Sequence, residues 1–326
     1  MGLILAHLKK VPFVRSLARK FREAYYRYRF RGLMFDCWRY FRNRESRTLY
    51  RRAKARMAPS SLEQRVIREL KETGISVVQL SDLLPGQTIS KIQEWAEALL
   101  RAPDIKERIR ILENGVRPAA RSNWDKFYIV KPLGDSPVFD IRDDVLEMVL
   151  SEPILRIVCG YLGMFSRLAY MNLWYNVATD GPDEFSQRWH RDPEDRSIIK
   201  TFLYLRDVDE TNGPFCYVPG THTASAFTQR IGVPNYPDDG VVEKRFPSGL
   251  RQVCTGKAGT LIFCDTTGFH KGGHPTAGAR FLFNTVYLPN SSEPIAKKHR
   301  FYSVKGMCND LQHPAARYAV SHLVDS

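Results

Sequence analysis

The sequence of residues 187–195 is Gln-Arg-Trp-His-Arg-Asp-Pro-Glu-Asp, which places His190 and Asp192 two positions apart. In a β-strand, positions i and i+2 point to the same face of the sheet. We therefore expect residues 186–192 to form a strand from which an imidazole and a carboxylate project side by side. Two such side chains can bind one metal ion if a third ligand comes from elsewhere in the chain.

Short segments with the character of strands surround this stretch from residue 167 onward. Turn residues such as Asp180-Gly181 and Asn212-Gly213 separate them, and Asn-Gly between two apolar segments is a strong hairpin signal. Many short strands with such turns predict a sandwich or a jelly-roll barrel. The expected strands are 167–177, 186–192, 197–208, 215–219, 260–264, 268–270 and 280–289.

The part of the chain before residue 165 has mainly helical patterns. Ser60 and Glu63 have the spacing of a capping box, which predicts a helix that continues to about Thr73 and ends at Gly74. Further helices are expected at 88–102 and 143–162, the second interrupted near Pro153, and short strands at 75–80 and 124–132. With the strand-rich half, these segments predict an α+β fold.

The excess positive charge of the chain lies at its N-terminus. Residues 1–57 contain 17 Lys and Arg but only 3 Asp and Glu, whereas the remaining residues contain equal numbers of each sign. Apolar and aromatic residues recur among the basic ones at helical spacing. We expect residues 1–57 to form a basic amphipathic helical arm and residues 58–326 to form one domain.

Three roles of the arm are compatible with its composition. A basic amphipathic helix suits an anionic membrane surface, and it also suits packing on the rest of the chain or on a second subunit. Arginines and aromatic rings can bind nucleic acid, but no known nucleic-acid module is visible, so we do not expect that partner.

The sequence contains no apolar segment of the length that crosses a bilayer, and the apolar N-terminal residues are too few for a signal peptide. The six cysteines are scattered and form no Cys-x-x-Cys pair, which is typical of a reducing compartment. We expect a cytoplasmic protein whose contact with the inner face of a membrane is peripheral.

A third metal ligand is available downstream of His190. His270 follows the apolar segment 260–264 and a turn, so it would lie at the end of a strand. His274 is the rival, but it lies in a Gly-Gly-His-Pro turn, and a ligand is better held by a rigid element. Two histidines and one carboxylate form the facial triad of non-haem Fe(II) oxygenases, although His-x-Asp alone is a weak pattern.

Arg280 strengthens this interpretation. It begins the segment Arg280–Pro289, where an inward-pointing arginine needs an anionic partner. The planar guanidinium group binds a carboxylate in bidentate fashion. A ligand with a carboxylate at each end could bind the metal through its 2-oxo acid group and Arg280 through the other carboxylate. 2-Oxoglutarate is such a ligand.

Residues 187–280 resemble the phytanoyl-CoA dioxygenase family of Fe(II)/2-oxoglutarate-dependent oxygenases. The matching segments are Trp-His-Arg-Asp at 189–192, Asp-Glu-Thr-Asn-Gly-Pro-Phe-Cys-Tyr-Val-Pro-Gly-Thr-His at 209–222, and Gly-Thr-Leu-Ile-Phe-Cys-Asp at 259–265 followed by His270 and Arg280. The resemblance implies a double-stranded β-helix (jelly-roll) core with flanking helices. The arm has no counterpart in the resemblance.

The resemblance also implies the roles of individual residues. His190, Asp192 and His270 would be the catalytic residues that bind Fe(II), and Arg280 would bind the distal carboxylate of 2-oxoglutarate. Family members often carry a small hydroxyl residue near the distal histidine, and here Thr276 is the candidate. The other end of 2-oxoglutarate has four candidate ligands in the sequence, which are Asn172, Tyr170, Lys126 and Tyr128.

These expectations converge on a dioxygenase that hydroxylates a small-molecule or lipid-linked substrate and releases succinate and CO2. Halogenating relatives lack the carboxylate that Asp192 provides, so its presence favours hydroxylation or a related oxidation. The alternative is a non-catalytic jelly-roll protein that uses its basic arm to dock on a membrane or a partner.

Overall fold

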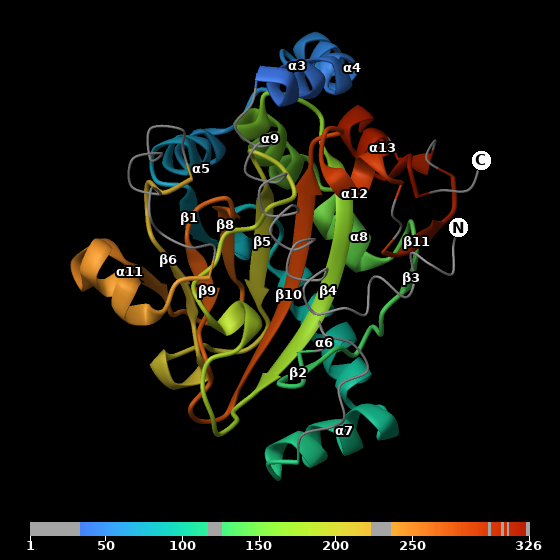
Figure 1. Ribbon diagram of the computed structural model, residues 1–326. Helices are drawn as coiled ribbons and strands as arrows, with labels where there is room; N and C mark the ends of the chain where they lie inside the picture. Colours follow the sequence, from blue (N-terminus) through green and yellow to red (C-terminus); the bar gives the residue numbers. More distant parts are fainter. Residues whose placement is uncertain are drawn as a thin grey trace, which may run out of the picture. The chain divides into compact units, whose positions relative to one another are not determined.

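The computed structural model describes residues 33–116, 126–222, 236–298, 301–307, 310–311 and 313–323 (Figure 1). The chain divides into two units, Met1–Arg44 and Glu45–Ser326. In the first unit the described residues form α3 (Leu33–Arg42). The part of the expected helical arm (residues 1–57) that precedes residue 33 lies outside the described residues, so the prediction stays untested there.

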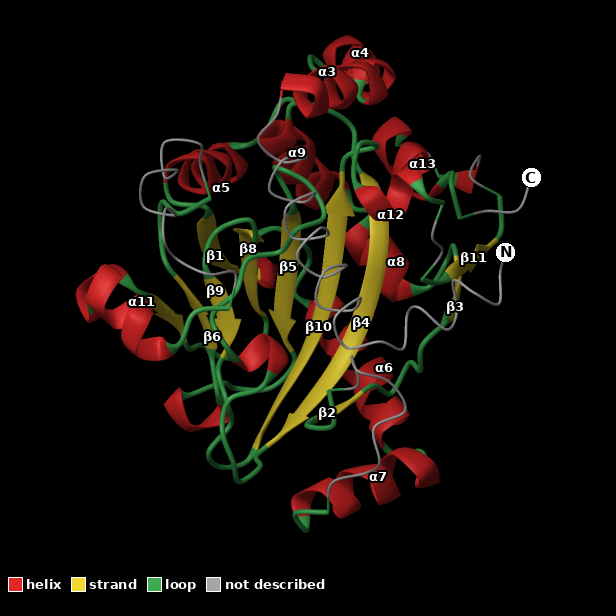
Figure 2. Cartoon of the chain, in the orientation of Figure 1, coloured by secondary structure: helices red, strands yellow, loops and turns green. Residues whose placement is uncertain are grey.

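Most of the α-helices precede residue 165 in the part of the chain that the structure describes. Figure 2 shows the helices beside the strands of the sheets. The α-helices from residue 44 onward are α4 (Arg44–Ala53), α5 (Ser61–Glu72), α6 (Gln87–Leu100), α7 (Pro103–Glu113), α8 (Asp144–Val149), α9 (Glu152–Leu162), α11 (Asp239–Arg245), α12 (Glu293–Ala296) and α13 (Pro314–Val320). The strands are β1 (Ile75–Gln79), β2 (Ile129–Val130), β3 (Val138–Asp140), β4 (Arg167–Val177), β5 (Ile199–Tyr204), β6 (Phe215–Tyr217), β7 (Gln252–Cys254), β8 (Thr260–Asp265), β9 (His270–Gly272), β10 (Ala279–Leu288) and β11 (Ser303–Lys305). Short 3-10 helices lie at η1 (Leu80–Asp82), η2 (Phe185–Gln187), η3 (Glu210–Asn212) and η5 (Ser248–Leu250).

Two antiparallel sheets form the β-structure around the site. The larger has six strands in the order β1-β8-β5-β10-β4-β2, and the smaller has three in the order β7-β6-β9. β3 and β11 pair separately in parallel. The expected α+β class with flanking helices is confirmed.

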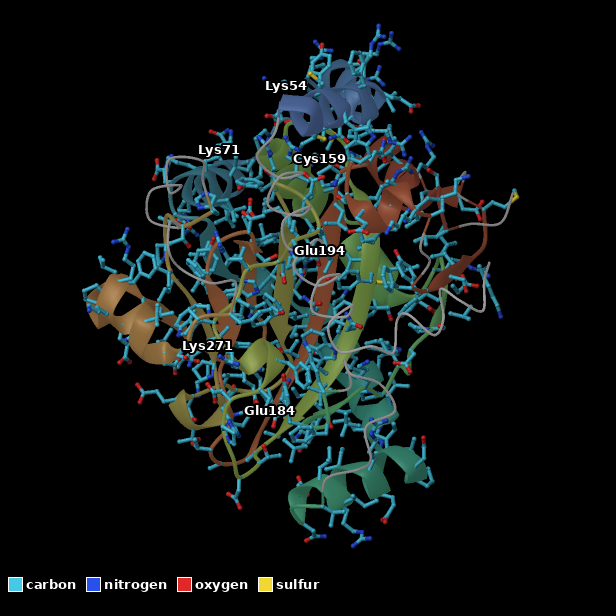
Figure 3. The ribbon with its side chains drawn as sticks, viewed as in Figure 1. Lys54, Lys71, Cys159, Glu184, Glu194 and Lys271 are labelled. Atoms are coloured by element: carbon cyan, nitrogen blue, oxygen red, sulfur yellow. The ribbon has the colours of Figure 1, made fainter. Side chains whose placement is uncertain are left out.

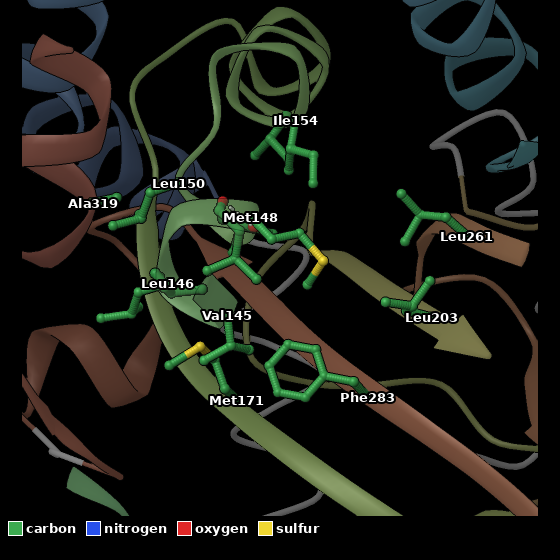
Figure 4. Close-up of a cluster of buried hydrophobic side chains, with 14 of the residues drawn as sticks. Val145, Leu146, Met148, Leu150, Ile154, Met171, Leu203, Leu261, Phe283 and Ala319 are labelled. Carbon is green, nitrogen blue, oxygen red and sulfur yellow. Dashed lines mark hydrogen bonds between the residues drawn. The ribbon is translucent and has the colours of Figure 1, made fainter. Parts of the chain in front are cut away.

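The long strands of the larger sheet are buried on both faces, and each face has its own apolar cluster. Alternate residues of β10, such as Phe281 and Phe283, pack in a large core with Leu155 of α9. Figure 4 shows Phe283 in this core together with Leu146 of α8. The intervening Leu282 belongs to a second cluster that includes Phe215 of the smaller sheet. The period of two therefore places every second residue of β10 between the two sheets.

One expected strand is absent. Residues 186–192 contain η2 and an irregular segment, and His190 forms only an isolated bridge with His270. Pro193, and Gly181-Pro182 in the loop before η2, do not favour an extended ladder. The assumption that His190 and Asp192 lie together on a regular strand was therefore wrong, although both side chains do reach one site.

The turn at Asn212-Gly213 was also predicted in the wrong context. Gly213 has a φ of +68° after η3, and Asp209 caps this short helix by accepting from the backbone N–H groups of Thr211 and Asn212. The turn connects β5 with β6, which belong to different sheets. It therefore carries the chain from one sheet to the other instead of closing a hairpin.

Candidate metal centre and cofactor cavity

Backbone hydrogen bonds bring the two segments of the candidate metal centre together. The amide of His190 donates to the carbonyl of His270 at 2.9 Å, and the amide of His270 donates to the carbonyl of His190 at 3.0 Å. Two residues further on, the amide of Asp192 donates to the carbonyl of Thr266 at 2.9 Å. Main-chain contacts thus fix the loop after η2 against the beginning of β9, without a regular strand at His190.

The side chains of His190, Asp192 and His270 converge. One ligand atom from each lies within 4.8 Å of the others, and Nε2 of His270 lies 3.4 Å from Oδ2 of Asp192. Nε2 of His190 lies 3.8 Å from Oδ1 of Asp192. Among the described residues, no other group of three His, Cys, Asp or Glu side chains meets in this way.

The outer nitrogens of both imidazoles have backbone partners. Nδ1 of His190 lies 2.8 Å from the carbonyl of Arg188, and Nδ1 of His270 lies 3.0 Å from the carbonyl of Gly268. A carbonyl oxygen only accepts hydrogen bonds, so Nδ1 of each ring is the N–H donor and Nε2 presents its lone pair inward. Metal-ligating histidines commonly have this arrangement.

Burial and the neighbouring His270 lower the pKa of His190 to about 3, so this imidazole is neutral at physiological pH. Burial would raise the pKa of Asp192, but Lys200 and the two histidines together hold it well below its usual value. Two imidazoles and one carboxylate, with room for further ligands, fit the preferences of Fe(II) in non-haem oxygenases.

A cavity of about 250 Å³ adjoins these three side chains. Its walls come from β4, β5 and β10 of the larger sheet and from β6 and β9 of the smaller one. Trp174, Phe202, Phe215 and Leu282 make parts of the wall apolar. The cavity is large enough for a compact dicarboxylate beside a metal ion.

Arg280 lies in this cavity and is only 4% exposed. Its Nη1 donates to the carbonyl of Gly273 at 3.2 Å, whereas its Nε has no hydrogen-bond partner among the described residues. Burial lowers its pKa, and no described acidic side chain forms an ion pair with it. A buried guanidinium group without an anion is costly, so its place in the cavity fits the carboxylate of a ligand.

Further donors lie near Arg280. Nζ of Lys126 donates to Oγ of Ser186 at 2.9 Å, and the hydroxyl of Tyr128 lies 3.0 Å from the same oxygen. Burial and the positive charge of Lys200 lower the pKa of Lys126 to about 8. Because Lys126, Ser186 and Arg280 line the same cavity, they offer positive charge and hydrogen bonds to a ligand carboxylate.

A second charged group lies beside Asp192. Nζ of Lys200 is 2.7 Å from Oδ2 of Asp192 and 3.5 Å from Oε1 of Glu194, and the hydroxyl of Tyr170 donates to Oε1 of Glu194 at 3.3 Å. Glu194 and Lys200 are not among the site residues predicted from the sequence. The signal for Lys200 was a charge inside the apolar segment 198–205, since a buried lysine needs a partner.

The structure places the remaining predicted residues differently. Thr276 is exposed and donates to the carbonyl of Thr211 at 3.3 Å, so it does not line the cavity. Asn172 pairs with Asn284 and shares its face of the sheet, but only Asn284 lines the cavity. The rival ligand His274 instead contacts Asp183 at 3.1 Å, outside the cavity.

Comparisons with solved structures find weak similarities. EctD from S. alaskensis, solved with 2-oxoglutarate and 5-hydroxyectoine, is 18% identical over 71% of this chain and 77% of its own, with a TM-score of 0.49. The non-haem alpha ketoglutarate dependent epimerase SnoN from nogalamycin biosynthesis is 16% identical over 70% of this chain and 83% of its own, with a TM-score of 0.46. AviO1 from Streptomyces viridochromogenes Tue57 is 18% identical over 71% of this chain and 97% of its own, with a TM-score of 0.46. Similarities at this level add nothing to the assignment of a substrate.

The comparison with protein families is more informative. No curated protein matches the chain. The model of the phytanoyl-CoA dioxygenase family matches residues 71–281, which is more than half of the chain and includes His190, Asp192, His270 and Arg280. The chain therefore belongs to the phytanoyl-CoA dioxygenase family and is an Fe(II)/2-oxoglutarate-dependent oxygenase, as the sequence predicts.

Proposed function

We propose that this oxygenase hydroxylates a small-molecule substrate, with His190, Asp192 and His270 holding Fe(II). The reaction would consume one O2, convert 2-oxoglutarate to succinate and CO2, and insert one oxygen atom into a C–H bond of the substrate. The observation that carries the proposal is the coexistence, in one cavity, of this convergent triad and the buried Arg280 without an anion.

The chain's own residues would do four things in this reaction. The two histidines and Asp192 would fix the metal at one place in the cavity, with both imidazole rings oriented by backbone carbonyls. Arg280 would bind the distal carboxylate of 2-oxoglutarate and thereby fix its orientation. Lys126 and Ser186 would add positive charge and a hydroxyl near the same carboxylate. The apolar walls would exclude water from the reacting atoms.

Succinate formation from 2-oxoglutarate tests this proposal. Purified protein with Fe(II), ascorbate and O2 is expected to form succinate slowly even without substrate, and His190→Ala is expected to reduce the rate by at least 100-fold, because removal of one ligand leaves two. His274→Ala is the matched control, since His274 lies outside the cavity, and it is expected to retain the rate.

The outcomes separate the proposal from its alternatives. Loss of succinate formation in His274→Ala but not in His270→Ala would make His274 the third ligand and overturn our site. If the unaltered protein binds neither Mn(II) nor 2-oxoglutarate, the result would instead favour the non-catalytic alternative. Incorporation of label from ¹⁸O2 into an oxidised substrate would distinguish hydroxylation from desaturation, which leaves no label in the product.

We also propose that the basic N-terminal segment contacts an anionic membrane surface. In its described part, Tyr40 and Phe41 are exposed near the C-terminal end of α3, where Arg39 and Arg42 also lie. Aromatic and basic side chains together suit the interface of an anionic bilayer. None of the described helices combines the length and the apolar character needed to cross a membrane.

The structure indicates where to truncate the chain for a test of this segment. Leu49 and Tyr50 of α4 and the buried Met57 pack in the core of the second unit, so a protein that starts at Glu45 keeps them. Full-length protein is expected to co-sediment with phosphatidylserine vesicles at low salt, and the shortened protein is not. If both proteins co-sediment equally, the N-terminal segment before Glu45 does not provide the membrane contact. The boundary that the sequence places after residue 57 stays a prediction.

A further inference from the structure

The two ends of the cavity offer opposite hydrogen-bonding groups. β10 supplies Arg280 at one end, and six residues further along the same strand Val286 pairs with Tyr170 of β4 and Lys200 of β5. At about 3.4 Å for each residue, these two levels of the sheet are roughly 20 Å apart. The Arg280 end presents donors, as a dicarboxylate requires. The end at Tyr170 and Lys200, which we call the acceptor end, has a different composition.

Two buried acceptors at this end lack partners. Tyr170 and Lys200 both contact Oε1 of Glu194, and Oε2 of Glu194 has no hydrogen-bond partner among the described residues. Asn284 donates from Nδ2 to the carbonyl of Thr201 at 3.1 Å, which leaves its Oδ1 without a described partner. Glu194 (labelled in Figure 3) and Asn284 both line the cavity. A buried acceptor without a donor is costly, so these oxygens fit a ligand that supplies donors.

The positive charge at the acceptor end is already engaged. Nζ of Lys200 lies 2.7 Å from Asp192 and 3.5 Å from Glu194, and it lies over the ring of Tyr170 at 5.5 Å from the ring centroid. Its three N–H groups thus face two carboxylates and an aromatic face. An anionic group of a substrate would meet two carboxylates here and a lysine that is already paired.

We propose that the acceptor end recognises a hydrogen-bond donor of the substrate, either an ammonium or a hydroxyl group, through Oε2 of Glu194 and Oδ1 of Asn284. This inference rests on the proposed function, because it takes the Arg280 end to be occupied by 2-oxoglutarate. Since Asp192 contacts Lys200, the acceptor end adjoins the metal centre, and a donor group bound there would hold a nearby carbon of the substrate beside the metal. The substrate class is therefore an amine or alcohol with an apolar part for Phe202 and Trp174, and not a carboxylate or phosphate at this position.

Three six-carbon probes test this preference: hexylammonium, hexan-1-ol and hexanoate. The full-length protein is loaded with Mn(II), which does not support turnover, and saturated with 2-oxoglutarate, which occupies Arg280. Paramagnetic broadening of each probe's proton signals, relative to Zn(II)-loaded protein, reports binding near the metal. We expect hexylammonium or hexan-1-ol to bind at least tenfold more tightly than hexanoate, and the stronger of the two identifies the donor.

A substitution locates the binding. Glu194→Gln keeps the shape of the side chain but replaces the charged acceptor, so it is expected to weaken hexylammonium about tenfold, in line with the loss of one charge-assisted hydrogen bond. Glu243→Gln on α11 is the matched control, because Glu243 is exposed and outside the cavity.

Each outcome decides the inference. The inference is overturned if hexanoate binds as tightly as the other probes, or if none of the three probes is broadened. It is also overturned if Glu194→Gln leaves the affinity for hexylammonium unchanged. Broadening of the 2-oxoglutarate signals by Mn(II) in the same samples reports separately on the proposed function. Its absence would refute that function, whereas its presence without the probe preference would refute only the recognition at the acceptor end. The comparison of the three probes on the unaltered protein tests the inference even if the Glu194→Gln variant does not fold.

Discussion

Gly272 shows how a single residue changes the environment of Arg280. Related enzymes often have a small hydroxyl residue near the distal histidine, but a Cβ atom at Gly272 would lie 2.9 Å from Nη2 of Arg280. The absence of a side chain therefore leaves room for the guanidinium group. A hydroxyl is still available in the same cavity, because Ser186 lies there with its oxygen 2.9 Å from Lys126. The sequence could not indicate Ser186, since residues 126 and 186 are distant along the chain.

Lys126 should make the binding of 2-oxoglutarate depend on pH. Its pKa of about 8, lowered chiefly by burial, means that the ammonium form dominates below pH 8 and is lost as the pH rises further. If this charge helps to bind a carboxylate, the affinity for 2-oxoglutarate falls above about pH 8. Calorimetric titration of Mn(II)-loaded protein between about pH 7 and pH 9 measures this effect. Lys126→Met should bind more weakly at pH 7 and lose the dependence, and a dependence that persists in this variant would assign it to another group.

At the scale of elements, the capping box of α5 was predictable and its tertiary partner was not. Ser60 and Glu63 exchange the expected hydrogen bonds, at 3.3 Å and 3.1 Å. Glu63 is also buried against Arg156 of α9, with N–O distances of 2.8 and 2.9 Å. The local spacing encodes the first interaction, whereas the second depends on how α5 and α9 pack. One carboxylate therefore caps a helix and joins it to another.

This double role predicts the order of two destabilising substitutions. Ser60→Ala removes one capping bond and should lower the free energy of unfolding by about 1 kcal/mol. Glu63→Ala should lower it by roughly 3 kcal/mol, because it also leaves the mostly buried Arg156 with only Glu152 as a described partner. Urea denaturation followed by circular dichroism measures both values. An effect of Glu63→Ala no larger than that of Ser60→Ala would show that the pair between α5 and α9 contributes nothing.

At the scale of the whole molecule, the sequence predicts the bounds of the strands better than it predicts which strands pair with one another. β4 has the expected bounds of 167–177, because a segment rich in apolar and aromatic residues between turns is a local signal. Its pairing with β10 joins segments far apart in the chain, and no local pattern encodes that choice. The candidate site divides in the same way. His190, Asp192, His270 and Arg280 are detectable as a motif, whereas Glu194 acquires its place in the cavity only through the packing of the loop against β5.

The assembled site predicts how the stability of the whole molecule responds to its ligands. A ligand that binds only the folded state at 100 times its dissociation constant stabilises that state by about 2.7 kcal/mol. The triad brings together ligands from two segments that are separate in the unfolded chain, so Mn(II) with 2-oxoglutarate should bind the folded state alone. The melting temperature should then rise by roughly 5 °C or more, and EDTA should reverse the rise. His270→Ala should melt at a temperature that the same ligands hardly change. An equal rise in the melting temperature of this variant would place the metal away from His270. If the melting temperature of the unaltered protein does not rise, the assignment of these two ligands to the site is wrong.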